Sequence, residues 1–582
     1  MSGPTPPGVA SRTGAADEGA RIVARLRADL DVAGYTVDGV RDLLGDVASA
    51  ALEREQSAPA RRALTVRGVD GGRGVDGGRD IDTGSGASRD PRAALTRLFL
   101  LGDEVSRADL DRALPGVGAD GARRLGLVRV AGSAPGDAVA AAVELHPYAA
   151  EDAGGQVAWW LASDLGELAT GGRLAADHVL GAGGASTTLA QVTVRTPVGR
   201  VLDLGTGCGI QALHAARHAR HVVGTDISRR ALDFARFNVA LNMPFPGADH
   251  AAGADPGDGI PTNRMLGGAG SGAGGVELRH GSMLEPVAGE QFDLVVSNPP
   301  FVITPRAGAA GRAVTEAIGD YEYRDGGRAG DDLVRDLIIG VGGVLAPGGV
   351  AQLLGNWEHR RGEPWTERVG AWLDDAGLDG WVIQRELLDP AEYAETWIRD
   401  GGTTPDREPA AWAAAYGAWL DDFAARDVEG VGFGIVTLRR PADGARPTLR
   451  RLEEHAGSVR QPLGAHLAAS LAAHDWLAAR DDDALAAAHL VVAPDVTEER
   501  HLTPGAADPN VIVVRQGDGL GRGVHASTGL AAFVGVCDGE LAVGQIVGAI
   551  AALFDVPAED LRAELLPAVR GLVRDGFLRP RD

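Results

Sequence analysis

The chain has 582 residues, a formal net charge of −24 at pH 7 and 45% hydrophobic residues. A chain of this length is expected to fold as about three to four domains rather than around one core. The acidic balance argues against a protein that coats nucleic acid non-specifically, because such binding uses Lys and Arg to neutralise phosphates. Only two cysteines occur, which excludes a disulfide scaffold and a cysteine zinc site. The sequence has neither an apolar signal region nor an apolar run of about 18 residues, so we expect a cytoplasmic protein.

Residues 1–138 predict a mainly helical domain that ends in the helix, turn, helix and strand outline of a winged helix. The hexapeptide GVDGGR occurs twice in tandem within this domain, which predicts a flexible Gly-rich insert at 66–90. A β-hairpin linker is predicted at 139–174, where VELHPY pairs with QVAWWLAS across a Gly-containing turn.

From residue 199 onward, strands, Gly-rich turns and helices alternate, which predicts a parallel sheet. Seven strand candidates are VGRVLDLG, VVGTDI, VELRHG, FDLVVSN, GGVAQLLGNW, WVIQRELL and GVGFGIVTLRR. We therefore predict an α/β domain at 175–441, with a Rossmann-like, mostly parallel sheet and a flexible insert at 243–275. Residues 442–582 return to apolar helices and predict a second domain of winged-helix type, with a helical cap on the sheet as the alternative.

A glycine-rich loop follows the first strand of this sheet, in the sequence VLDLGTGCG. Gly205, Gly207 and Gly209 let the backbone turn sharply and approach a ligand closely. Asp226 ends the second strand, where an acid can accept hydrogen bonds from the ribose hydroxyls of a bound nucleoside. The G-x-G-x-G spacing differs from the G-x-G-x-x-G spacing of dinucleotide enzymes.

With Asp203 before it, this loop resembles motif I of the class I S-adenosylmethionine-dependent methyltransferases, and the resemblance covers roughly 175–440. The resemblance implies the class I methyltransferase fold, with the loop on the methionine end of the cofactor and Asp203 helping to hold its ammonium group. An Asp in the family commonly accepts from the adenine amino group, whereas Ser282 stands there in this chain as a neutral, weaker acceptor. No metal is expected. The implied cofactor contacts are Asp203, Gly205, Thr206, Gly207, Gly209, Asp226, Ile227, Ser282 and Met283.

The fourth strand runs into Asn298-Pro299-Pro300-Phe301, which resembles motif IV of the amino-methylating branch of that family. The Asn298 oxygen and the Pro299 carbonyl can each accept an N–H of a planar amino nitrogen and so aim its lone pair at the methyl group. The two prolines hold these acceptors rigidly, and Phe301 offers a ring face for stacking on the acceptor. These four residues are the predicted catalytic residues. No strong base is needed, because the nitrogen becomes acidic once it carries the methyl group.

The resemblance leaves the methyl acceptor open. An exocyclic base amine in ribosomal RNA is favoured by Phe301, as in the small rRNA guanine-N2 methyltransferases, and by flanks that could hold RNA. The alternative is the glutamine carboxamide of a translation release factor, which the continuation NPPFVITP and the acidic charge support. The segment Asp325-Gly326-Gly327 resembles the DGG that follows NPP in both groups.

Two further alternatives belong to other classes of protein. A non-catalytic scaffold is disfavoured by the intact Asp203, Asp226 and Asn298, and an NAD-dependent dehydrogenase by the loop spacing. His214 and His218 lie four residues apart, but no third metal ligand accompanies them.

Overall fold

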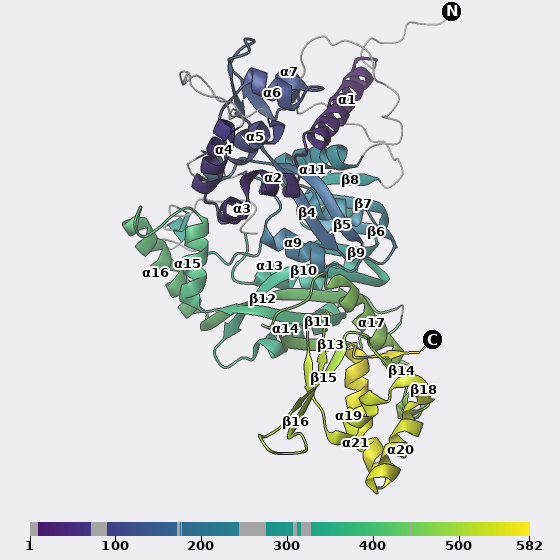
Figure 1. Ribbon diagram of the computed structural model, residues 1–582. Helices are drawn as coiled ribbons and strands as arrows, with labels where there is room; N and C mark the ends of the chain where they lie inside the picture. The colour runs from purple at the N-terminus through teal and green to yellow at the C-terminus, as the bar shows by residue number, and fades with distance from the viewer. Residues whose placement is uncertain are drawn as a thin grey trace, which may run out of the picture.

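The computed structural model describes residues 10–70, 90–170, 175, 177–243, 275–306, 311–312, 314–315, 327–442 and 444–581. Most of both predicted Gly-rich inserts, at 66–90 and 243–275, lies outside the described residues, as do Asp325 and Gly326. Figure 1 shows the N-terminal helices and the C-terminal helices at opposite ends of the molecule, with a large sheet between them.

The central sheet has eight strands in the order β13-β11-β12-β10-β9-β6-β7-β8. Neighbours are parallel from β8 to β10, β12 is antiparallel to both of its neighbours, and β11 pairs parallel with β13. The predicted α/β class with a mostly parallel sheet is confirmed; the eighth strand, β13, was not predicted and lies beyond residue 441. The strands are β6 (Val198–Leu204), β7 (Ala219–Asp226), β8 (Val276–His280), β9 (Phe292–Ser297), β10 (Leu345–Arg360), β11 (Asp379–Leu388), β12 (Val428–Arg439) and β13 (Arg450–Glu454).

Helices cover both faces of this sheet because alternate strand residues point to opposite sides. Leu202 and Val295 are buried on the face covered by α13 and α14, whereas Val201 and Val296 are buried on the face covered by α10. The helices around the sheet are α8 (Glu167–Thr170), α9 (Gly184–Val192), α10 (Ile210–Ala215), α11 (Arg229–Asn242), α13 (Asp332–Gly340) and α14 (Trp365–Ala376), with 3-10 turns at Glu285–Val287 and Val341–Val344. Two further helices, α15 (Pro390–Asp400) and α16 (Pro409–Ala425), are inserted between β11 and β12.

The N-terminal part packs its helices around a small three-stranded sheet, ordered β1-β3-β2. This order of elements suits the winged-helix assignment, which stays a prediction. The elements are α1 (Ala10–Val32), α2 (Val37–Leu44), α3 (Asp46–Leu52), α4 (Ala58–Asp70), α5 (Pro91–Leu95), a π-helix (Thr96–Leu100), β1 (Val105–Ser106), α6 (Arg107–Ala113), α7 (Gly118–Arg124), β2 (Val128–Val130) and β3 (Ala138–Ala141).

The hairpin of β4 (Glu144–Asp152) and β5 (Gly155–Ser163) lies beside α11 (Figure 1). Side-chain hydrogen bonds fasten it to that helix. The fully buried Asn238 carboxamide accepts from Ala162 N at 2.7 Å and donates to Ala162 O at 2.9 Å and to Cys208 O at 2.8 Å. One side chain therefore joins the edge of the hairpin to the glycine loop.

The C-terminal part is attached to β13 by ion pairs. Arg451 of β13 lies 2.7 Å from Asp575, and Glu453 lies 2.7 Å from Arg522. No helix in the described part of the chain is long and apolar enough to cross a membrane. The C-terminal elements are α17 (Gly464–Ala478), α18 (Asp482–Ala486), β14 (His489–Val492), β15 (Val496–His501), β16 (Val511–Gln516), β17 (Gly523–His525), α19 (Thr528–Gly535), β18 (Asp538–Ala542), α20 (Val543–Phe554), α21 (Ala558–Arg574) and β19 (Leu578–Pro580).

The Asn238 bridge predicts a measurable loss of stability. Asn238→Ala leaves the Ala162 amide and two buried carbonyls without a partner, so we expect the free energy of unfolding to fall by about 3 kcal/mol. Chemical denaturation followed by circular dichroism measures this change. The exposed Asn510→Ala is the control and should shift stability by no more than about 0.5 kcal/mol. Equal effects of the two substitutions would show that the bridge does not hold the hairpin.

Candidate active site

A cavity of about 1720 Å³ lies at the carboxyl edge of the parallel strands. The strand register builds its floor, because Leu204 at the end of β6 pairs with Thr225 of β7 and with Ser297 of β9. The chain segments that follow these three residues leave the sheet at one level, where parallel α/β sheets bind ligands. Single small ligands usually occupy about 300–1,000 Å³, so this cavity has room for two bound groups.

The glycine loop lines the cavity. Gly207 has a φ of +53°, which L side chains rarely adopt, and a Cβ there would meet no atom within 4 Å. Gly209 has a different reason to be glycine, because its Cβ would lie 3.0 Å from the Cβ of Ala235 on α11. Gly205 and Gly207 therefore leave open space for a ligand, whereas Gly209 allows close packing beneath the loop.

Asp203 lies beneath this loop and is not among the described residues that line the cavity. Its carboxylate accepts a hydrogen bond of 2.6 Å from the Thr206 hydroxyl, and the residue is 1% exposed. Burial raises the pKa of Asp203 to about 7. In this position the carboxylate holds the loop through Thr206, and the contact between Asp203 and a cofactor stays a prediction.

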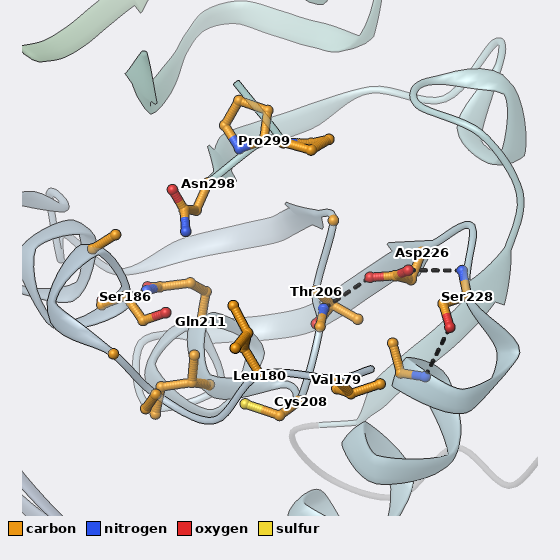
Figure 2. A pocket seen from close by; sticks show the side chains of 18 of the residues that line it. Val179, Leu180, Ser186, Thr206, Cys208, Gln211, Asp226, Ser228, Asn298 and Pro299 are labelled. Atoms are coloured by element: carbon orange, nitrogen blue, oxygen red, sulfur yellow. Dashed lines mark hydrogen bonds between the residues drawn. The ribbon is translucent and has the colours of Figure 1, made fainter. Parts of the chain in front are cut away.

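Asp226 stands at the rim of the cavity, as Figure 2 shows. Its two oxygens accept from Gly207 N at 2.9 Å and from Ser228 N at 2.8 Å, so it joins the glycine loop to the start of α11. Burial raises the pKa of Asp226, and each oxygen keeps a second lone pair for a ligand hydroxyl. Ile227 beside it is 57% exposed toward the cavity.

The turn after β8 supplies another wall of the cavity. Ser282 and Met283, two of the predicted cofactor contacts, both line it, and Gly281 N donates to Asp226 O at 3.0 Å. Met283 has a φ of +47°, a strained value for a side chain of this size, which is common at binding sites.

Asn298, Pro299 and Pro300 line the cavity on the side of β9. The Asn298 Oδ1 atom is buried and has no hydrogen-bond partner among the described residues. A buried polar atom normally has a partner, so this oxygen is available for a donor on a bound molecule.

Phe301 is placed differently from the prediction, since it is not among the described residues that line the cavity. Its ring packs edge-to-face with Phe433 of β12 at 6.3 Å, and its carbonyl accepts from Asn356 Nδ2 at 2.8 Å. The next residue but one, Ile303, donates to the Tyr393 hydroxyl oxygen and accepts from Trp419 Nε1, both at 2.8 Å. In this arrangement Phe301 anchors the proline corner against β12 and does not offer a ring face to the cavity.

Several lining residues were not predicted, and Gln211 on α10 is the most informative. It is 4% exposed, its Nε2 donates to Ser186 O at 2.7 Å, and its Oε1 has no partner among the described residues. The sequence offered one signal for this residue: a glutamine in the mainly apolar segment IQALHA, directly after the glycine loop.

A buried chain of polar groups also reaches the cavity through Tyr148, which no sequence pattern indicated. Tyr148 Oη lies 3.0 Å from His214 Nε2, and His214 Nδ1 lies 2.6 Å from Asp152 Oδ2. Arg217 lies 2.7 Å from the other oxygen of Asp152. His214 is therefore a member of a hydrogen-bond chain, consistent with setting it aside as a metal ligand.

Sequence comparison relates the part of the chain that carries the glycine loop to known methyltransferases. Residues 185–252 match the family model of the ribosomal protein L11 methyltransferase (PrmA). This segment, which contains the glycine loop and Asp226, is therefore similar in sequence to a methyltransferase family. The flanks match two domains of unknown function, DUF7059 at 32–142 and DUF7782 at 468–580.

Relatives of the methyltransferase domain act on translation components, according to their names. A release factor glutamine methyltransferase of Xylella fastidiosa is 32% identical over 198 residues, which are 32% of this chain and 56% of that protein. A ribosomal protein uL3 glutamine methyltransferase of Bradyrhizobium diazoefficiens is 29% identical over 33% of this chain and 53% of that protein. A ribosomal RNA small subunit methyltransferase C of Alcanivorax borkumensis is 27% identical over 31% of this chain and 36% of that protein. The chain thus spans about half the length of the glutamine methyltransferases it matches.

Among solved structures, the YcgJ protein of Bacillus subtilis aligns with 44% of this chain and 96% of its own, at 16% identity and a TM-score of 0.23.

The buried Asp203 predicts a pH-dependent difference in stability. Its pKa is raised from 3.8 to about 7 on folding, so the native state is progressively destabilised as the pH rises through this interval. Asp203→Asn keeps an acceptor for Thr206 but cannot ionise. The variant should therefore gain stability over the wild type between pH 4.5 and 8, by up to roughly 4 kcal/mol.

Thermal or urea unfolding across this pH range measures the difference between the two proteins. The exposed Asp421→Asn is the control, and its difference from the wild type should stay nearly constant with pH. A constant difference for Asp203→Asn as well would mean that Asp203 is already ionised throughout.

Proposed function

We propose that this protein is an S-adenosylmethionine-dependent N-methyltransferase that methylates the side-chain carboxamide of a glutamine in a protein partner. The observation that carries the proposal is the buried, unpartnered Asn298 Oδ1 on the wall of a cavity that also presents the glycine loop and Asp226. The matched methyltransferase family and the two glutamine methyltransferases named above support it.

The cavity offers open space, an acceptor and apolar surface that suit this cofactor. Gly205 and Gly207 leave room beside the loop, and the Asp226 carboxylate has free lone pairs for the two ribose hydroxyls. Ile227 and Met283 supply apolar surface for the adenine ring. When bound, S-adenosylmethionine supplies a methyl group activated on a sulfonium.

Asn298 would position the nitrogen that receives this methyl group. Its Oδ1 can accept one N–H of a carboxamide, and the Pro299 carbonyl can accept the other, so both hydrogens point away from the methyl group. Pro299 and Pro300 fix these two oxygens in place before the substrate binds. This lowers the free-energy cost of orienting the substrate nitrogen. The hydrogen bond from this N–H to the buried Asn298 oxygen strengthens as the nitrogen becomes positive during methyl transfer. The oxygen has no other described partner that would weaken it.

The charge of the cavity favours a protein acceptor over RNA. Among the described residues that line it, eight are carboxylates and one, Arg328, is a guanidinium. Some of these carboxylates have basic partners: Asp164 pairs with Arg230, and Asp336 pairs with Arg335 and with Arg328 itself. A phosphate backbone would be repelled here, whereas a neutral or basic polypeptide would not. The eight are Glu53, Glu55, Glu144, Asp164, Asp177, Asp226, Asp336 and Asp400.

Replacing Asn298 tests the proposed chemistry. Asn298→Ala removes the first acceptor, so we expect turnover to fall by about 10²–10³-fold while the affinity for S-adenosylhomocysteine stays within about twofold. Methyl transfer from labelled cofactor measures the first quantity and calorimetry the second. Asn298→Asp keeps an oxygen at this position and serves as the matched control, with activity above that of the alanine variant. Unchanged turnover of Asn298→Ala would contradict the proposed role of the corner.

The acceptor can be identified in extracts of a strain that lacks the gene. Purified enzyme and tritiated S-adenosylmethionine are added, and protein, RNA and DNA are separated and counted. We expect label in protein, and peptide mass spectrometry should place one added methyl group on a glutamine. Label confined to RNA would overturn the glutamine proposal and support the base-amine alternative, which the rRNA methyltransferase relative favours. Absence of label with intact cofactor binding would support the scaffold alternative.

A further inference from the structure

The wall of the cavity opposite Asp226 contains an acceptor that no described residue satisfies. Figure 2 shows Gln211 and Asn298 on the side of the cavity away from Asp226. Gln211 Nε2 donates to Ser186 O at 2.7 Å, and this bond fixes which end of the carboxamide carries the oxygen. Oε1 is then left without a partner among the described residues, and Gln211 is only 4% exposed.

A buried acceptor of this kind is normally paired with a donor, and a ligand in the cavity can supply one. The neighbours of Gln211 on α10 are the buried apolar residues Ile210, Ala212 and Leu213, so an apolar side chain would fit the helix better than glutamine. A carboxamide oxygen bonds most strongly to a charged N–H donor. The side chain is therefore suited to a cationic group in the cavity.

Tyr148 adds a second acceptor to the same cavity. The Asp152 carboxylate, beside Arg195 and Arg217, lies 2.6 Å from His214 Nδ1 and accepts its hydrogen. Burial lowers the pKa of His214, and with Nδ1–H directed at Asp152 its Nε2 can accept the Tyr148 hydroxyl hydrogen at 3.0 Å. The Tyr148 oxygen is then left with lone pairs only; it also interacts with the Thr187 hydroxyl, and both residues line the cavity.

Asp203 lies under the glycine loop, where its Oδ2 accepts from the Thr206 hydroxyl, and it is not among the described residues that line the cavity. In the proposed function, Asp226 binds the ribose and the methyl group lies near Asn298. The amino-acid end of the cofactor then extends toward Gln211.

We propose that Gln211 Oε1 and the Tyr148 oxygen, and not Asp203, receive the ammonium group of the bound cofactor. The assignment rests on the proposed function and names the residues of this chain that select the α-amino group. The Gln211 Nε2 donor stays committed to Ser186, so the carboxylate of the same ligand is bound elsewhere.

The test compares three ligands by calorimetry on the full chain. They are S-adenosylhomocysteine, its analogue without the α-amino group, and 5′-methylthioadenosine, which lacks the whole amino-acid end. Loss of one hydrogen bond to a charged group corresponds to about tenfold or more in affinity. Q211L should therefore weaken S-adenosylhomocysteine by at least about tenfold, and leave the desamino analogue and 5′-methylthioadenosine within about twofold.

Three further variants complete the experiment. Y148F should show the same selective loss, and Q211M repeats the Gln211 test if Q211L does not fold. D203N, which acts through the loop, should change the affinities for all three ligands by one common factor. Selective loss of S-adenosylhomocysteine in D203N, with none in Q211L or Q211M, would overturn the assignment. A uniform loss in the Gln211 variants would also overturn it, because it would indicate a purely structural bond to Ser186. Failure of the wild type to bind any of the three ligands would instead refute the proposed function.

Discussion

The parallel pairing of β6 with β7 on one side and β9 on the other is the constraint on which the site depends. Leu204 is in register with Thr225 and Ser297, and the Ser297 hydroxyl donates to Leu204 O at 2.9 Å. The glycine loop, Asp226 and Asn298 therefore start from one level of the sheet, although nearly a hundred residues separate the first from the last. A slip of one residue in either pairing would turn one of these groups to the opposite face.

Residues that occupy strand ends could be placed from the sequence, since the βαβ pattern brings carboxyl ends to one edge. Asp226, Asn298 and the two prolines were found in this way. Asp203 and Phe301 belong to the same motifs, but their side chains point below the loop and toward Phe433. A motif gives the spacing of residues along the chain and does not give the direction of each side chain.

Other features depend on contacts distant in sequence. β13 has the charged sequence RRLEE and only five residues, so it resembles a loop until its pairing with β11 is seen. Tyr148 reaches the cavity because the hairpin is fastened to α11 by Asn238. Neither contact leaves a periodic pattern in the sequence, whereas the apolar runs of β6, β9 and β10 did.

The parts of the chain that complete the cavity bear directly on its selectivity. Glu53 and Glu55 follow α3, Glu144 begins the hairpin, and Asp400 ends α15, so three walls come from outside the strands that carry the motifs. The matched segment of the methyltransferase family, 185–252, includes none of these four residues. Under the proposed function, the matched segment would contact the cofactor, while the rest of the acceptor would contact walls that lie outside this segment. Under the proposed function, carboxylates on these walls would select by repulsion as well as attraction, because they would disfavour polyanions that could otherwise present an amino group.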